Sequence, residues 1–146
     1  MPGTREASVH LATFPDAGTL ASWRNDALAS EWRQLLDLRG TVNAALEGAR
    51  QRKEIGNALS AHVTIAAGGA LAGLLQTYQD DLPMLFITSQ VTVVPSEAND
   101  PVVTVTPATG EKCPRCWRYV PELMTSGPAT GVCDRCANAI REAHGH

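Results

Sequence analysis

The four cysteines of this chain constrain its fold more than any other feature. They form two Cys-x2-Cys pairs separated by sixteen residues: Cys113, Cys116, Cys133 and Cys136. Two residues between the members of a pair let the backbone turn so that both sulfurs reach one ion. Two such pairs complete the tetrahedral set that Zn²⁺ adopts in structural sites. The spacing therefore predicts one zinc ion held by four thiolates.

A site with four thiolates is structural, because no coordination position stays open for water or substrate. The segment around it, residues 110–146, is too short to bury a core of its own, so zinc would supply much of its folding free energy. The alternative is two disulfides, which require an oxidising compartment. The N-terminus lacks the basic and apolar regions of a secretory signal, so we expect zinc and a cytoplasmic protein.

The length of 146 residues suits one domain of ordinary size or two small ones. This length excludes a two-domain enzyme with its own nucleotide-binding half. No stretch approaches 18 consecutive apolar residues, so we expect no membrane partner. We also expect a monomer.

The net charge of −3 hides an uneven distribution of cations. Eleven of the twelve Lys and Arg residues lie in residues 22–56 and 111–146, whereas residues 57–110 contain none. The two flanks could both contact a polyanion, with the middle spacing them. They could equally be solvated surface on a helix and a small metal domain. Charge alone leaves both interpretations open.

Helical periodicity dominates the first third of the chain. Residues 1–19 show no periodicity, and a helix is predicted from Asn25 or Asp26, both good N-caps, to Lys53. Cations gather in its last turn, where the helix dipole favours them, and Gly56 could stop it. Such a helix would be roughly 42 Å long. We expect it to pack in a bundle with helices outside this chain.

The middle of the chain changes period. Residues 61–65 alternate as a strand does, and residues 70–80 fit a short helix. Three further runs of apolar or β-branched residues predict strands: residues 84–88, 91–94 and 102–105. Together they predict a small β-α-β-β-β unit, and residues 106–110 a linker. The expected fold class is α+β, made of a long helix, this unit and a zinc ribbon.

The residues around the cysteines extend the pattern beyond spacing. Residues 110–119 (GEKCPRCWRY) and 132–136 (VCDRC) closely resemble the C-terminal zinc-binding segment of bacterial isoleucyl-tRNA synthetases. The resemblance continues upstream through residues 8–15, 36–43, 46–53 and 85–91. It implies four parts: an irregular first segment (1–19), the end of a helical anticodon-binding domain (20–56), a small α/β junction domain (57–109) and a zinc-binding domain (110–146).

The resemblance implies a tRNA-binding part of isoleucine–tRNA ligase that contributes to recognition of the anticodon stem-loop. Its partners would be isoleucine tRNA and the remainder of the synthetase. No adenylation site is expected, because the Lys-rich catalytic loop of the family cannot be built from Lys53 and Lys112 alone. No editing site is expected either, because the chain resembles a C-terminal fragment of a much larger ligase. We therefore name no catalytic and no cofactor-binding residue. The candidate RNA contacts are Arg50, Arg52, Lys53, Arg115, Trp117, Arg118 and Arg135.

Each of these candidates also has a structural interpretation. Arg50, Arg52 and Lys53 could instead stabilise the helix C-terminus without contacting RNA. Trp117 could stack on an unpaired base or cover the small zinc core.

Two other functions remain open at this stage. A free-standing interaction module could use the same zinc ribbon without RNA. Formamidopyrimidine-type DNA glycosylases carry a similar finger, but their N-terminal Pro-Glu pair is absent, because Gly3 follows Pro2.

Overall fold

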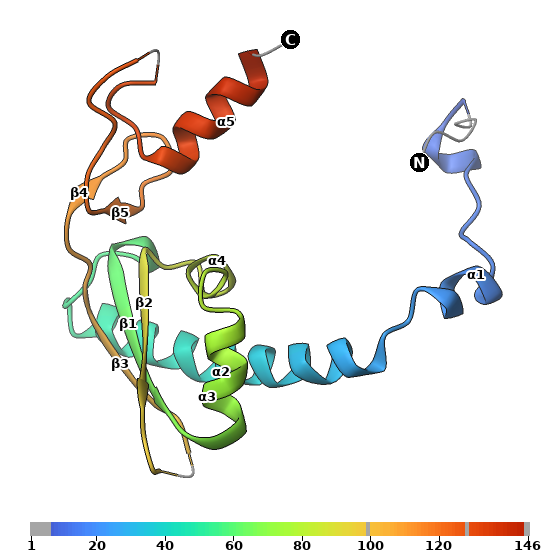
Figure 1. Cartoon of the computed structure of the whole chain (residues 1–146), viewed down its shortest axis with the longest axis horizontal. Helices are drawn as coiled ribbons and strands as arrows, with labels where there is room; N and C mark the ends of the chain where they lie inside the picture. The colour runs from blue at the N-terminus through green and yellow to red at the C-terminus, as the bar shows by residue number, and fades with distance from the viewer. Residues whose placement is uncertain (1–6, 99, 128, 145–146) are drawn as a thin grey trace. The chain divides into compact units, whose positions relative to one another are not determined.

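The computed structural model of the chain describes residues 7–98, 100–127 and 129–144 (Figure 1). Its helices are α1 (Ala17–Ser22), α2 (Asp26–Gln51), α3 (Gly69–Thr77), α4 (Leu82–Leu85) and α5 (Asp134–His144). Its strands are β1 (Ala61–Ala67), β2 (Gln90–Pro95), β3 (Val102–Pro107), β4 (Glu111–Lys112) and β5 (Tyr119–Val120). Single 3-10 turns span Val9–Leu11 and Ala58–Ser60. The mixture of helix and sheet agrees with the expected class.

The chain divides into two units, Met1–Trp32 and Arg33–His146. Residues 1–6 of the predicted irregular segment, and residues 145–146 of the predicted zinc domain, lie outside the described residues. Helix α1 begins inside the predicted irregular segment because Asp16 caps it, accepting a hydrogen bond of 3.0 Å from the Thr19 backbone. Large apolar side chains of this first unit are exposed: Leu11, Phe14, Leu20, Trp23, Leu28 and Trp32.

Helix α2 starts where the sequence predicts and ends two residues earlier. The Asn25 side chain accepts from the Leu28 backbone at 3.0 Å, as an N-cap does. At the other end Lys53 adopts a left-handed φ of 61°. The Lys53 N–H bonds the Arg50 carbonyl, and the Glu54 N–H bonds the Ala49 carbonyl. This is the Schellman arrangement, in which the left-handed residue after the helix is Lys53, so Lys53 and not Gly56 terminates the helix.

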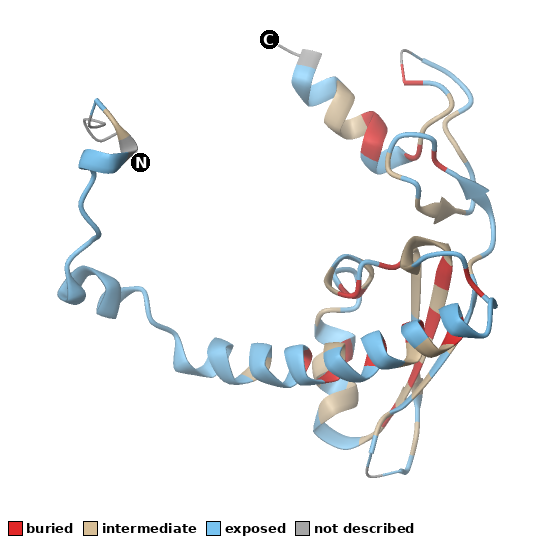
Figure 2. Ribbon diagram, turned by 180° about the vertical axis from the view of Figure 1, so that it is seen from behind, coloured by how far each residue is buried: buried red, intermediate tan, exposed pale blue. Residues whose placement is uncertain are grey.

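A three-stranded sheet of order β2-β1-β3 forms the centre of the second unit. Strand β1 runs parallel to β2 and antiparallel to β3, with Val63 opposite Val91 and Val105. Alternate residues of β1 are buried, which places one face of the sheet in the core. Figure 2 shows this buried stripe beside α2. The other core side chains are Leu35, Leu38, Val42, Leu46 and Ala49 of α2, Leu75 of α3, Leu82 of α4, and Ile55 and Phe86.

The predicted strand over residues 84–88 is wrong, and the unit is β-α-α-β-β instead of β-α-β-β-β. Pro83 lies in the first turn of α4, where its missing N–H costs nothing. Leu82 and Phe86, four residues apart, are both buried, which is helical spacing. Ile87 then turns the chain with a φ of 57°. An apolar run this short does not reveal its period.

The last part of the chain is a small ribbon. Strands β4 and β5 pair antiparallel, with Lys112 opposite Tyr119, and α5 follows the second cysteine pair. None of the described helices combines the length and apolar character that a bilayer-spanning segment needs.

Candidate metal centre

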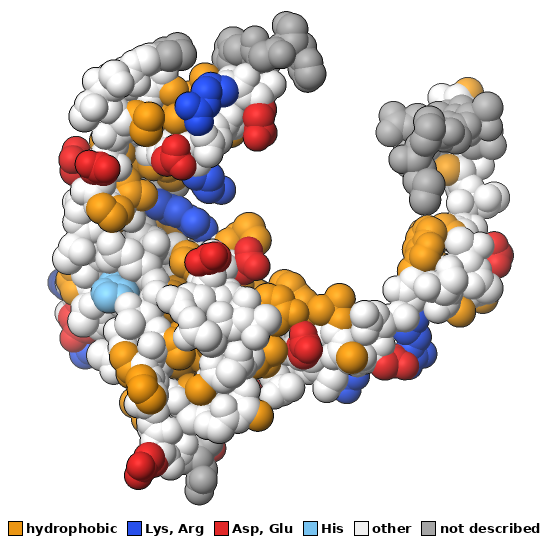
Figure 3. All heavy atoms as spheres, in the orientation of Figure 1, with side chains coloured by type: hydrophobic (Ala, Val, Ile, Leu, Met, Phe, Trp, Pro, Cys, Tyr) orange, Lys and Arg blue, Asp and Glu red, His pale blue; other side chains and the backbone are white. Residues whose placement is uncertain are grey.

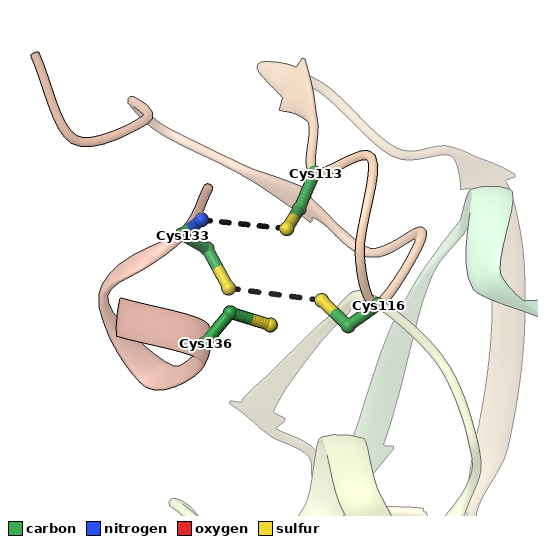
Figure 4. A group of neighbouring side chains, drawn as sticks. All are labelled: Cys113, Cys116, Cys133 and Cys136. Atoms are coloured by element: carbon green, nitrogen blue, oxygen red, sulfur yellow. Dashed lines mark hydrogen bonds between the residues drawn. The ribbon is translucent and has the colours of Figure 1, made fainter. Parts of the chain in front are cut away.

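The four cysteine sulfurs converge on one point (Figure 4). All four Sγ atoms lie within 4.8 Å of one another. Cys113 and Cys116 come from the turn between β4 and β5, whereas Cys133 precedes α5 and Cys136 lies in its first turn. Cys116 is half-buried and the other three are buried. The geometry fits a single tetrahedral ion bound by four thiolates.

Backbone hydrogen bonds hold both cysteine turns in shape. The Trp117 N–H donates to the Cys113 carbonyl at 2.8 Å, and the Cys113 N–H donates to the Arg118 carbonyl at 2.9 Å. In the second turn the Ala137 N–H donates to the Cys133 carbonyl at 2.9 Å. The Cys133 N–H points at the Cys113 sulfur, 3.3 Å away, and links the two turns.

The local electrostatics suit bound thiolates. Burial raises the pKa of Cys113, but N–H groups of Cys133, Cys116 and Arg115 aimed at its sulfur outweigh burial and lower the pKa to about 6. Burial raises the pKa of Cys133 to about 12. A divalent cation compensates such a burial cost and releases the proton. The donor set and its N–H partners therefore fit zinc.

The core of the ribbon consists largely of the thiols themselves. Three cysteines form its buried centre, and Cys116, Val120, Leu123 and Val132 pack around them. This cluster is separate from the core between α2 and the sheet. The burial of so few apolar side chains does not offset the conformational entropy lost when the ribbon folds. Binding of the ion must supply the remaining free energy.

Two of the candidate RNA contacts at the end of α2 are engaged by carboxylates. Arg50 donates from Nε and Nη2 to the two oxygens of Glu47, both at 2.8 Å. Arg52 pairs in the same way with Glu54, at 2.8 and 2.9 Å. To contact RNA, these two guanidiniums would have to leave their carboxylate partners and bind a phosphate instead. Lys53 occupies the left-handed position that ends the helix.

Trp117 does not cover the zinc core. Its side chain is 61% exposed, and the core is covered instead by Val120, Leu123 and Val132. Its backbone has a left-handed φ of 67°, which directs the chain out of the first cysteine turn. Lys112, which sequence reasoning did not select, lies with Nζ 5.9 Å from the centroid of the Trp117 ring. The sequence feature that could have pointed to Lys112 is its position directly before Cys113.

The three ribbon arginines take different positions. Arg115 is exposed, and interaction with the Cys136 side chain raises the pKa of its guanidinium. Arg118 donates from Nη2 to the Pro83 carbonyl at 3.1 Å. Arg118 and Arg135 line a groove of 410 Å³ together with Pro83, Ser89, Glu122 and Asp134. Figure 3 shows basic side chains beside the hollow between the ribbon and α4.

Comparison with known proteins adds a family to this geometry. Residues 110–139 match a family described as "Zinc finger found in FPG and IleRS". The isoleucine–tRNA ligase of Geobacter sulfurreducens is 39% identical over 150 residues, which cover 97% of this chain and 16% of that protein. That of Syntrophotalea carbinolica is 40% identical over 151 residues, with the same coverage. That of Staphylococcus haemolyticus is 39% identical over 147 residues and 96% of this chain. The chain thus spans about 16% of the length of these relatives.

Proposed function

Because the chain is homologous to the zinc-finger region of isoleucine–tRNA ligases, we propose that it is a tRNA-binding part of such a ligase. In this proposal it contributes to recognition of the anticodon stem-loop of isoleucine tRNA in the cytoplasm. Cys113, Cys116, Cys133 and Cys136 hold one structural zinc ion, which shapes the ribbon. We assign neither adenylation nor editing to this segment. Its proposed parts are an α/β junction domain over residues 57–109 and a zinc-binding domain over residues 110–146.

The observation that carries the proposal is the exposed Trp117 on a metal-fixed turn. Trp117 is 61% exposed and so could present the ring face opposite Lys112 to a base, and unpaired RNA bases stack on aromatic side chains. Lys112 beside the ring and Arg115 two residues earlier supply cations for the adjoining phosphates. A turn fixed by zinc holds this group in one geometry, which lowers the entropic cost of binding.

We rank the other candidate contacts by the partners that they have in the structure. Arg118 and Arg135 line the groove beside this turn, so an RNA strand seated on Trp117 could reach them. Arg50 and Arg52 already pair with Glu47 and Glu54, and exchange of carboxylate for phosphate yields less net energy. We therefore place the main contacts on the ribbon and keep Lys53 as a separate contact at the end of α2.

We further propose that the first unit packs against the remainder of the ligase. Leu28 and Trp32, four residues apart in α2, are exposed, as is Trp23 directly after α1, although apolar side chains at helical spacing ordinarily face a core. The relatives are about six times longer than this chain and so contain segments able to cover them. The expected bundle with helices outside this chain would then involve only the first half of α2, because its second half packs on the chain's own sheet.

A filter-binding titration of the zinc-loaded chain with isoleucine tRNA tests the RNA role. The variants are Trp117→Ala and Arg115→Gln, and the matched control is Arg24→Gln, an exposed arginine in an ion pair with Asp26. All titrations run at one ionic strength, since phosphate contacts depend on salt. We expect the ribbon variants to weaken binding and the control to leave it unchanged. Equal affinity of all three variants would overturn the assignment of contacts to the ribbon, and no binding by the unmodified chain would favour an interaction module without RNA.

A further inference from the structure

The hydroxyl of Ser89 joins the sheet to the zinc ribbon. Ser89 directly precedes β2, and its own N–H donates to the Ala61 carbonyl at the start of β1. Its Oγ donates to the Leu59 carbonyl and accepts a hydrogen bond of 2.7 Å from the N–H of Tyr119. Tyr119 is the first residue of β5. One part-buried side chain thus bridges two segments that are 30 residues away from it on either side.

The neighbouring residue, Gln90, holds the segment that leads into the ribbon. Its Nε2 donates to the Thr109 carbonyl at 2.9 Å, and its Oε1 accepts from the Thr109 N–H at 3.1 Å. The Gln90 side-chain amide therefore pairs with both the N–H and the carbonyl of Thr109, as the backbone of a neighbouring strand would. The Ala108 N–H also donates to the Ser60 carbonyl at 2.8 Å. The predicted linker is consequently fastened to the sheet over residues 108–109.

Gly110 brings the two sides of the ribbon into contact directly after this segment. Its φ is +99°, and a Cβ at this position would overlap the Val120 carbonyl. A side chain would therefore push β5 away from the incoming chain.

These contacts lead directly to the metal turn. The residue before Tyr119 is Arg118, whose carbonyl accepts from the Cys113 N–H at 2.9 Å. The guanidinium of Arg118 donates to the Pro83 carbonyl of α4 at 3.1 Å. The first cysteine turn is therefore attached on both sides. Before Cys113 it is held to the sheet through Thr109. After Cys116 it is held through Arg118 and Tyr119.

We propose that Ser89 and Gln90 are positioning residues that clamp the zinc ribbon to the sheet in one orientation. The clamp makes the ribbon and the sheet one rigid body, although their hydrophobic cores are separate. It fixes the direction in which the turn carrying Arg115 and Trp117 points. The consequence for RNA rests on the proposed function, whereas the rigid attachment does not.

Backbone ¹⁵N relaxation of the zinc-loaded chain tests the clamp, with rotational correlation times derived separately for residues 61–95 and 111–144. The test variants are Ser89→Ala, Gln90→Ala and the double variant. Ser96→Ala and Gln79→Ala are matched controls, because the Ser96 hydroxyl accepts from the Ala98 N–H of its own loop and Gln79 pairs with Gln76. Ser89→Thr keeps the hydroxyl and serves as the conservative rescue. Zinc content and the affinity for isoleucine tRNA are measured on the same samples.

We expect one shared correlation time in the unmodified chain, both controls and Ser89→Thr. In the double variant the ribbon should tumble faster than the sheet while one zinc per chain is retained. In the double variant we also expect RNA binding to weaken by about tenfold, because the ribbon is no longer held in one orientation before it binds. A correlation time that stays shared in the double variant would overturn the clamp. If the double variant unfolds, the same criterion applies to Gln90→Ala, which removes only a partly exposed side chain. The relaxation result stands even if the chain does not bind tRNA.

Discussion

The Nζ of Lys112 lies 5.9 Å from the centroid of the Trp117 ring, on the turn that carries the first two zinc ligands. This distance is within the range of a cation–π contact, which at exposed sites contributes about 0.5–1 kcal/mol. The contact leaves most of the indole in solvent, with its exposed fraction at 61%. This exposed indole is the surface on which the proposed RNA contact rests.

Replacing Trp117 with Gly should separate binding from folding. The left-handed backbone there costs Trp about 1–2 kcal/mol, and Gly adopts it freely but loses more chain entropy. We therefore expect the melting temperature and the zinc content to change little. RNA binding should weaken by about 5- to 100-fold, the range of one lost stacking contact. Loss of zinc from this variant would instead restore Trp117 as a cover of the core, and Trp23→Gly is the control for an exposed indole.

Chelation of zinc should unfold the ribbon and leave the sheet intact. The ribbon core is built mainly from three buried cysteines, whereas Val63, Ile65 and Phe86 belong to the separate core against α2. With a strong chelator, amide exchange protection should disappear over residues 111–144 and persist over β1. Re-addition of Zn²⁺ should restore it. A ribbon that stays protected without metal would contradict the structural role of the ion.

The ion pair at the end of α2 predicts a shifted titration. Hydrogen bonds from Arg50 and Gln51 lower the pKa of Glu47 from 4.5 to about 2. Because the folded pKa lies below the unfolded value, the pair stabilises the helix end above pH 4.5 and loses that contribution as the pH falls toward 2. The Glu47 carboxyl, followed by NMR, should titrate near 2, and in Arg50→Gln at a higher pH, with the remaining hydrogen bond from Gln51 still lowering its pKa. A midpoint of 4.5 in the unmodified chain would contradict the pairing seen here.

Ile87 offers a test of the turn between α4 and β2. It is a β-branched residue at a φ of 57°, and its side chain is 51% exposed. Asn tolerates this backbone conformation far better. Ile87→Asn should therefore raise the free energy of unfolding by about 1 kcal/mol, measured in urea. Ile87→Val, also β-branched, should show no gain. A lower stability of the Asn variant would mean that the apolar contacts of Ile87 outweigh its backbone cost.

The features that the sequence predicted best are those encoded by local spacing. The two Cys-x2-Cys pairs predicted the metal cluster, and the cap at Asn25 with its periodic apolar residues predicted α2. Helix α4 was missed because the short run over residues 84–88, four apolar residues and a threonine, fits both a strand and a helix, and Pro83 decided between them.

Contacts between distant residues could not be predicted in the same way. The bond between Ser89 and Tyr119 spans 30 residues, and no local spacing in the sequence indicates that these two residues meet. The exposure of Trp117 depends on Val120, Leu123 and Val132 filling the core in its place. The pairing of Arg50 with Glu47 has helical spacing, yet spacing does not tell whether a carboxylate or a phosphate is the partner.

The affinity of the zinc-loaded chain for isoleucine tRNA, compared with the same tRNA carrying a different anticodon, tests the central claim most directly. If the ribbon reads the anticodon stem-loop, the altered tRNA should bind more weakly at one fixed salt concentration. The difference should shrink in Trp117→Gly, because that variant lacks the stacking surface. Equal affinity for the two tRNAs would contradict the account.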